Sequence, residues 1–217
     1  MRKVQLLLVL VIAAIAARCD YSPGIPGSGK LISESRTASG FTGVSLKGTG
    51  QLVIDTNGTE SLVITADDNL LPYITSEIKD DQLILGTKDN TNISPSKDVV
   101  YKLSAKNLDL IELGGSGDIA AKGINTDRLK IMLLGSGNIS TAGTAERQEI
   151  TLAGSGNYRA EKLKSKTATI NLSGSGDADL DASEDLNVNI AGSGSVRYTG
   201  DARVTQKILG SGSVEKR

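Results

Sequence analysis

Aliphatic and polar residues alternate in short runs along the second half of the chain, and each run ends at a Gly-Ser-Gly triplet. Two residues before the triplets stand Leu113, Leu133, Leu152, Leu172, Ile190 and Ile208. The position four residues before each triplet is isoleucine or valine in every run except the last, which has Gln206. Because alternate positions of a β-strand share one face, each run predicts a strand whose aliphatic face points into a core.

The triplets recur at a nearly constant period. Their first glycines stand at 115, 135, 154, 174, 192 and 210, so that successive spacings are 20, 19, 20, 18 and 18 residues. Such a repeat is too short for a strand, a helix and their crossover, and it is typical of stacked solenoid coils. We therefore predict an all-β solenoid with coils of two or three short strands, stacked about 4.8 Å apart around a narrow aliphatic column.

The triplets themselves are expected to be structural corners. Glycine allows positive φ and close approach between backbone segments without steric cost. The predicted corner ladder consists of Gly115, Gly117, Gly135, Gly137, Gly154, Gly156, Gly174, Gly176, Gly192, Gly194, Gly210 and Gly212. The residues that follow the triplets are Asp118, Asn138, Asn157, Asp177, Ser195 and Ser213, all of them turn formers.

Three chemical readings of the triplets are weaker than the structural one. The GGSGD at 114–118 resembles a calcium-binding nonapeptide, but only two of the six units place a carboxylate there. A phosphate-binding glycine loop needs a helix behind it, and strand patterns follow instead. A serine nucleophile needs a base, and lysine could serve, but no Ser-x-x-Lys unit stands on a helix here. We therefore expect no catalytic, cofactor-binding or metal-binding residue, either in the triplets or elsewhere in the chain, and no cofactor.

The first half of the chain, residues 38–113, also reads as strands joined by polar turns. The GTG at 48–50 occupies a comparable corner, and Asn57-Gly58 indicates a turn between QLVIDT and SLVITA. A KDD turn separates PYITSEI from QLILGT, and residues 88–98 form a polar loop. The carboxylate pairs Asp67-Asp68 and Asp80-Asp81 are expected to be turn residues, because neither has a visible catalytic partner.

The N-terminus predicts export. MRK precedes VQLLLVLVIAAIAA, an apolar run that fits a signal-peptide core, so that residues 1–18 are assigned to a signal peptide. Two processing routes stay open: a lipoprotein-type leader that lipidates Cys19, which Arg18 fits poorly, or cleavage after Ala16 that releases a soluble protein. Residues 19–34 are rich in proline and glycine and are predicted to form a flexible tether, and their GSG at 27–29 is not counted as a repeat.

Composition removes several classes of function. The chain has no histidine and one cysteine, which excludes a Ser-His-Asp triad, imidazole metal sites and an internal disulfide. Its 24 Lys and Arg against 25 Asp and Glu provide no basic stripe for nucleic acid. Tyr and Phe total six and tryptophan is absent, so base stacking and sugar-ring stacking are poorly supported.

One segment carries a family resemblance. The run GFTGVSLKGTGQLVIDTNGTESLVITADDNLLPYITSEIKDDQLILGTK, followed by the GSGD and GSGN coils, resembles the head GIN domain, a family of auto-transporter adhesin heads. The resemblance covers residues 35–217, with a front half at 35–110 and a GSG-repeat half at 111–217. It implies a right-handed parallel β-helix, an exported protein and a lipoprotein-style leader, and it carries over no catalytic residue.

These observations favour an exported, non-enzymatic protein of the periplasm or cell envelope. The solenoid would present a flat face to an envelope protein or glycan. Nucleic acid is not an expected partner, and membrane contact is expected only through a lipid at Cys19. The expected state in solution is a monomer or a weak self-association.

Two other classes of function stay open. Parallel β-helices host polysaccharide-active enzymes, and Asp177, Asp179 and Asp181 alternate along one coil, with Arg159 and Lys162 on the coil before it. The third class is an envelope assembly or sensing component, because the last coil leaves an open sheet edge. Charged residues at 215–217 would discourage pairing there.

Overall fold

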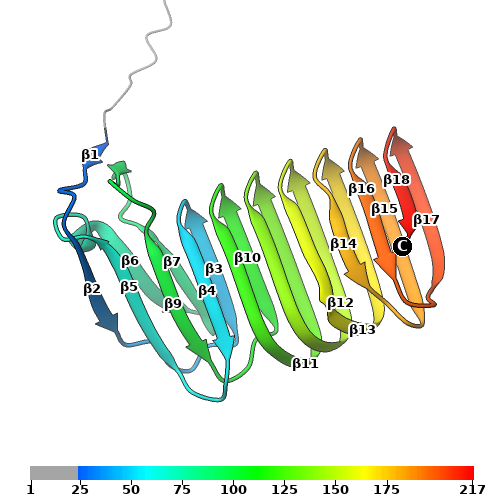
Figure 1. Cartoon of the computed structure of the whole chain (residues 1–217), viewed down its shortest axis with the longest axis horizontal. Helices are drawn as coiled ribbons and strands as arrows, with labels where there is room; N and C mark the ends of the chain where they lie inside the picture. Colours follow the sequence, from blue (N-terminus) through cyan, green and yellow to red (C-terminus); the bar gives the residue numbers. More distant parts are fainter. Residues whose placement is uncertain (1–23) are drawn as a thin grey trace, which may run out of the picture.

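The computed structural model describes residues 24–217, which wind into a β-solenoid of about five turns, with 70% of residues in strands and 2% in helix (Figure 1). Successive coils stack along the long axis of the molecule. The elements are β1 (Ile25–Pro26), β2 (Leu31–Arg36), β3 (Gly43–Gly48), β4 (Gln51–Thr56), β5 (Ser61–Asp67), η1 (Leu71–Tyr73), β6 (Ile74–Lys79), β7 (Gln82–Thr87), β8 (Ile93–Ser94), β9 (Val100–Ala105), β10 (Leu110–Gly115), β11 (Asp118–Gly135), β12 (Asn138–Gly154), β13 (Asn157–Gly174), β14 (Ala178–Asp181), β15 (Asp185–Gly192), β16 (Ser195–Thr199), β17 (Arg203–Gly210) and β18 (Ser213–Lys216).

Each coil contributes to two opposed faces. The first face has the strand order β6-β7-β3-β10-β11-β12-β13-β15-β17. The second face has the order β2-β5-β9-β4-β11-β12-β13-β14-β16-β18. β11, β12 and β13 belong to both faces because each runs for 17 or 18 residues and bends midway. The expectation of two or three separate short strands in every coil is therefore wrong for these three coils.

The glycine triplets lie along one edge of the solenoid. Gly48 pairs with Gly115, Gly115 with Gly135, and the register continues through the first glycine of every later triplet. At Gly135 φ is +149°, and a Cβ there would collide with the carbonyl oxygen of Gly115. The GTG at 48–50 is thus the first corner of the same row, as expected.

Coil length varies at the edge opposite the triplets. The β11–β12 register shifts between Ala121 and Ile124, and the β12–β13 register shifts between Ser140 and Ala142. Coils of 18 to 20 residues therefore keep both faces in register, because the bend between the faces takes up the extra residues.

The aliphatic positions that precede the triplets fill the core. Leu113, Leu133, Leu152, Leu172 and Ile190 are each at most 2% exposed. Ile208, in the last coil, is only partly buried because no further coil covers it. The predicted aliphatic column is confirmed for every coil that has a neighbour on both sides.

One stretch of the core is polar. The Tyr158 hydroxyl lies 3.0 Å from Thr141 Oγ1 and donates to Gln148 Oε1 at 2.8 Å. Gln148 Nε2 donates to Ser165 Oγ at 2.9 Å, and that hydroxyl donates to the carbonyl oxygen of Asp181 at 2.6 Å. Each side chain of this hydrogen-bonded series therefore has a partner, which offsets its loss of hydration.

Strands β5, β6, β7 and β9, which lie between the first and second corners in the sequence, form a cap beyond the first coil together with β2. β7 joins β3, and the antiparallel hairpin β6–β7 turns at Asp80 and Asp81, whose φ values are +51° and +59°. These two residues are turn residues, as predicted. The turn at Asn57-Gly58 behaves differently: β4 and β5 do not pair, because β9 lies between them, parallel to β4 and antiparallel to β5.

The predicted flexible tether is wrong from residue 24 onward. β1 pairs with β8 inside the predicted polar loop, and β2 pairs with β5. The buried Asp67 side chain fixes the segment between β1 and β2, since Gly29 N donates to its Oδ1 at 2.7 Å. β2 is mostly exposed, so backbone hydrogen bonds rather than apolar burial hold it in place. The sequence of β2 has no hydrophobic pattern from which the strand could be predicted. The signal peptide at 1–18, Cys19 and the rest of the tether lie outside the described residues.

Candidate binding surface

Polar side chains form a continuous row beside the triplets. Asn138 Nδ2 donates to Asp118 Oδ1 at 2.8 Å, and Asn157 Nδ2 donates to Asn138 Oδ1 at 3.0 Å. Asp177 N donates to Asn157 Oδ1 at 3.1 Å, and Ser195 N donates to Asp177 Oδ1 at 2.9 Å. The side chains of this row therefore bond mainly to one another and to the neighbouring coil, which is a structural use of the turn formers.

The carboxylates of the enzyme hypothesis do share one face. Asp179 is 6% exposed, and Arg197 donates to it from Nε at 2.6 Å and from Nη2 at 2.9 Å. Arg217 Nη2 lies 3.2 Å from the same carboxylate. The hydrogen bonds from Arg197 hold the pKa of Asp179 below its usual range.

Asp181 is also engaged. Its Oδ2 accepts from Lys164 Nζ at 2.9 Å and from Thr199 Oγ1 at 2.7 Å. A general acid for glycoside cleavage needs a raised pKa and room for a substrate beside it. The arrangement of these two carboxylates instead fits ion pairs that join coils.

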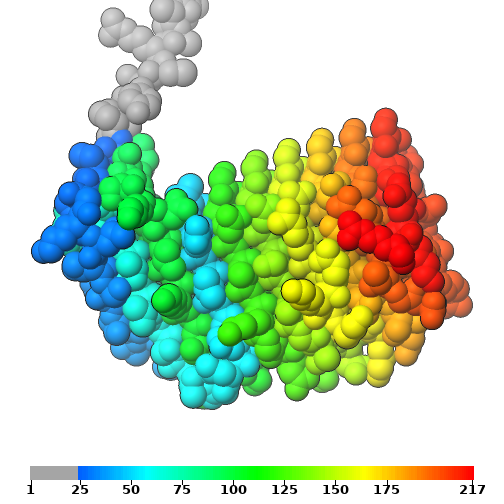
Figure 2. Space-filling view, in the orientation of Figure 1, coloured from blue at the N-terminus to red at the C-terminus, as the bar shows by residue number. Residues whose placement is uncertain are grey.

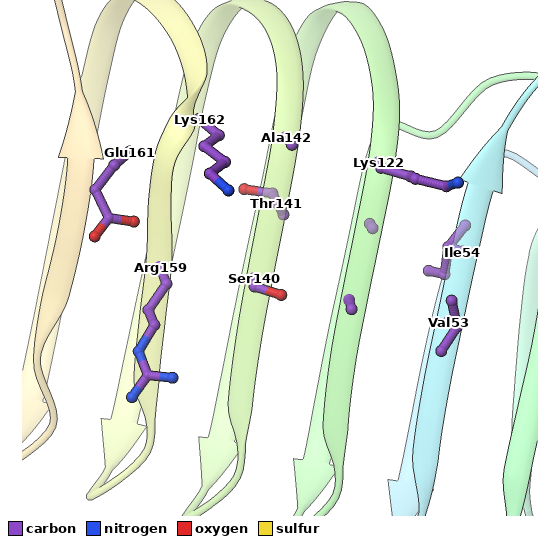
Figure 3. Close-up of a pocket in the computed structure, with 11 residues that line it drawn as sticks. Val53, Ile54, Lys122, Ser140, Thr141, Ala142, Arg159, Glu161 and Lys162 are labelled. Atoms are coloured by element: carbon purple, nitrogen blue, oxygen red, sulfur yellow. The ribbon is translucent and has the colours of Figure 1, made fainter.

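A depression of about 350 Å³ lies on the second face (Figure 3). Its floor is made by outward-facing small residues of three consecutive strands, Val53, Ala120 and Ser140, which stand next to one another in register. Arg159 follows in the same row on β13 and forms one wall. Lys162 stands near the bend, and Figure 3 shows its side chain directed toward Thr141 on β12.

A second depression of about 360 Å³ continues the first toward the triplet edge. The two share Val53, Ala120, Ser140 and Arg159, and the second adds Gln51, Asp118 and Asn138. We call the combined surface the groove. Its floor is apolar or small, cations stand on its wall and at its bend end, and amide and carboxylate groups stand at the triplet end.

The cations of the groove differ in their pairing. Lys122 Nζ lies 3.1 Å from Asp55 Oδ2. Within residues 24–217, Arg159 and Lys162 form no ion pair or hydrogen bond through their side chains, and Arg159 influences Asp179 only by its charge at longer range. These two cations are therefore available to an external anion.

The depressions at the bend are different. They are lined by charged residues that pair with one another, such as Lys166 with Glu146 at 2.5 Å and Lys164 with Asp181 at 2.9 Å. Their charges largely cancel, which leaves the groove as the stronger candidate. In the described part of the chain no three His, Cys, Asp or Glu side chains gather as a metal site, and no helix is long and apolar enough to cross a membrane.

Sequence reasoning singled out Arg159 and Lys162 but missed the groove. The floor depends on β4 of the front half pairing with β11 of the repeat half. Alignment on the glycines shows the outward floor residue three positions after Gly50, Gly117 and Gly137 only if the GTG at 48–50 is counted as a full member of the row.

A family model described as "Putative auto-transporter adhesin, head GIN domain" matches residues 40–202. No curated protein matches the chain at a significant level. The solved structures that resemble the chain include one described as a putative lipid binding protein from Parabacteroides distasonis, 26% identical, with a TM-score of 0.60, in which the match covers 89% of this chain and 99% of the other.

Two structures described as putative adhesins share the fold at lower identity. The protein from Bacteroides fragilis is 23% identical, with a TM-score of 0.71 and coverage of 89% and 100% of the two chains. The protein from Parabacteroides merdae is 23% identical, with a TM-score of 0.57 and coverage of 89% and 99%. The β-solenoid is thus a fold shared with proteins described as putative adhesins and with one described as a putative lipid binding protein.

Proposed function

Because the chain belongs to the head GIN domain family, we propose that it is a non-enzymatic, adhesin-like binding scaffold of the cell envelope and that the groove is its contact surface. The family indicates an extracellular or cell-envelope location and a binding role. The observation that carries the choice of surface is a pair of cations, Arg159 and Lys162, that no side chain of residues 24–217 pairs with, beside a floor of small residues.

The solenoid suits this role because it presents the groove on a rigid support. The floor strands are held on both sides by parallel neighbours, and the residues beneath them, Leu52, Ile119 and Ile139, are at most 1% exposed. A ligand would meet side chains that are already ordered, so little conformational entropy is lost on binding.

We propose export through the N-terminal leader, with Cys19 as the site of attachment to the membrane by a lipid. The support is the apolar core at 4–17 followed by small residues and a single cysteine. The mass of the mature N-terminus decides between a lipidated Cys19 and a free end after Ala16. A mass that matches an unmodified end would contradict the anchor and leave the binding role unaffected.

The contact surface is tested by filling the groove. Ala120→Tyr places a large side chain on the exposed floor, whereas Ala191→Tyr makes the same change at an exposed position of the first face. We expect wild type and Ala191→Tyr to bind purified envelope polysaccharides or membranes equally, and Ala120→Tyr to lose most of that binding. Equal binding by all three proteins, with unchanged circular dichroism, would show that the groove is not the contact surface.

An amphiphile is a second candidate ligand. The relative described as a lipid-binding protein motivates it, and the exposed Val53 and Ala120 of the floor favour it. Binding of anionic phospholipid vesicles by wild type and its loss in Ala120→Tyr would support this alternative.

A further inference from the structure

We propose that the groove binds an acidic polysaccharide, whose carboxylates or other anionic groups are held by Arg159 and Lys162. This inference rests on the proposed function, since it names the ligand class of the same surface.

The charges around the groove leave an unmatched positive site. Asp179, next to Arg159 in register, is already held by Arg197 and Arg217. Glu161 lies 3.6 Å from Arg217 Nη1 rather than beside Lys162. Asp179 and Glu161 are therefore committed to other cations, whereas Asp118, at the triplet end of the groove, accepts from the amide of Asn138. An external anion would complete the pairing of Arg159 and Lys162.

The position of the C-terminal residue is part of this arrangement. In Figure 2 the red C-terminal residues lie across neighbouring coils, and Arg217 N donates to the carbonyl oxygen of Tyr198 at 2.9 Å. Arg217 thereby reaches Glu161 and Asp179 on two different coils. Because Arg217 neutralises part of the negative charge of Glu161 and Asp179, the electrostatic potential at Arg159, on the adjacent wall of the groove, becomes more positive.

The shape of the groove suits an extended polymer. Its floor row starts beside Lys102 of β9 and ends at Arg159 of β13, four strand spacings or about 19 Å in all. No described element passes over the face at this point (Figures 1 and 3). A chain can therefore lie across several coils and enter or leave without a gate.

The same shape disfavours the other ligand classes. Sites for apolar ligands enclose most of the ligand surface, and an acyl chain on this open floor would stay half hydrated. Nucleic acid would need stacking side chains, and no aromatic residue lines the groove. Ser140, Asn138 and Gln51 already make one or two hydrogen bonds each within the protein. Their remaining amide hydrogens and oxygen lone pairs provide the polar contacts that sugar hydroxyls use.

The test compares two double variants with the same change in net charge. Arg159→Gln/Lys162→Gln removes the proposed contacts, and Lys130→Gln/Lys207→Gln removes two exposed cations of the first face. Isothermal titration with polygalacturonate is expected to show binding by wild type and the control. The groove variant is expected to bind about tenfold or more weakly, from the loss of two charge-assisted contacts. Wild-type binding should weaken as salt rises, and dextran, a neutral polymer, should not bind.

Three results would overturn the inference. The first is equal weakening of both double variants, which would reflect net charge alone. The second is binding of phosphatidylglycerol vesicles but not of polygalacturonate, which would assign the groove to amphiphiles. The third is loss of envelope binding in Ala120→Tyr with full binding in Arg159→Gln/Lys162→Gln, which would leave the proposed function standing and remove the acidic ligand. Failure of the proposed function itself is recognised separately, by unchanged envelope binding in Ala120→Tyr.

Discussion

Arg197 of β16 forms a bidentate ion pair with Asp179 of β14 on the preceding coil. Its Nε donates to Oδ1 at 2.6 Å, and its Nη2 donates to Oδ2 at 2.9 Å. The two residues are direct partners in the parallel register, so their pairing crosses one strand spacing. The carboxylate side is almost buried, whereas the guanidinium side is about one-third exposed. This pair joins the last coils on the second face, close to the groove.

Replacement of Arg197 should destabilise the fold. Arg197→Gln leaves Asp179 with only Arg217 as a close cation, and we expect the free energy of unfolding to fall by about 1–3 kcal/mol. Arg203→Gln is the matched control, because Arg203 pairs with Asp185 at 2.6 Å but is 82% exposed, and exposed pairs contribute about 0–1 kcal/mol. Urea denaturation measures the free energy of unfolding of both variants. Equal losses would contradict the expectation that the more buried ion pair contributes more to stability.

Acid should weaken the cap through Asp67. The hydrogen bond from Ser96 Oγ, at 2.6 Å, lowers the pKa of Asp67 below its usual range, and Ser96 N donates to the same carboxylate at 2.9 Å. A group whose folded pKa is depressed contributes stability above its unfolded pKa of about 4 and loses it as pH falls through the folded value. Stability should therefore hold near pH 5 and above, and decline below about pH 4.

The Asp67→Asn variant tests whether protonation of Asp67 causes the loss of stability in acid. It should be less stable than wild type at pH 7 and show a shallower decline in thermal midpoint between pH 5 and pH 3. Asp89→Asn, which changes an exposed residue of the loop that contains Ser96, should follow the wild-type curve. Parallel curves for wild type and Asp67→Asn would assign the acid sensitivity to other groups, among them Asp179, whose pKa is also lowered.

Substitution of the first glycine of a triplet by any other residue should destabilise the fold. Gly135→Ala combines a left-handed φ with a collision against the carbonyl oxygen of Gly115, and we expect a loss of about 3 kcal/mol or more, or failure to fold. Gly40→Ala shares the positive φ, at +79°, but meets no atom within 4 Å, so its cost should be about 1–2 kcal/mol from backbone strain alone. Thermal unfolding followed by circular dichroism compares the two, and similar costs would show that stacking of the corners does not forbid Cβ.

The polar chain in the core should depend on its tyrosine. Tyr158→Phe leaves Gln148 Oε1 buried without its donor, which is expected to cost about 1–3 kcal/mol. Tyr198→Phe, at a partly exposed position near the last coil, should change stability by less than about 0.5 kcal/mol. An unchanged Tyr158→Phe protein would mean that the amide finds another partner.

Burial should also be visible in the ionisation of tyrosines. Loss of hydration raises the pKa of Tyr158 and raises the pKa of Tyr101 to about 12. Ultraviolet titration of the folded protein should therefore leave these two phenols neutral at pH 11 and release them only on unfolding. Full ionisation of all tyrosines at that pH without loss of circular dichroism would contradict the buried positions.

The periodic half of the fold was predictable because one alternation and one spacing determine it. Every coil has an aliphatic residue equivalent to Leu133 and a corner glycine equivalent to Gly135. The position of each strand, the face that it buries and the stacking of the coils therefore follow from the local pattern. The cap was not predictable in the same way. β9 enters between β4 and β5 although Asn57-Gly58 indicates a direct turn, because strand order depends on pairing between distant segments.

The candidate site was predictable only in part. Arg159 and Lys162 are visible in the sequence as cations on one coil. That the neighbouring carboxylates of the described chain, Glu161 and Asp179, pair with Arg217 and Arg197 instead depends on the folded arrangement of the last coils. The groove floor requires the register between Val53 and Ala120, which are separated by the whole cap. β2 was missed because its order comes from backbone hydrogen bonds, which leave no trace in side-chain hydrophobicity.

The bend opposite the triplets changes length from coil to coil while both faces keep their pairing, as at Ala142 and Gly143. A foreign peptide grafted there would project from the edge of the molecule without disturbing the aliphatic column or the row of glycines. Repeated on several coils, such grafts would display a linear array of epitopes at a pitch set by the backbone itself.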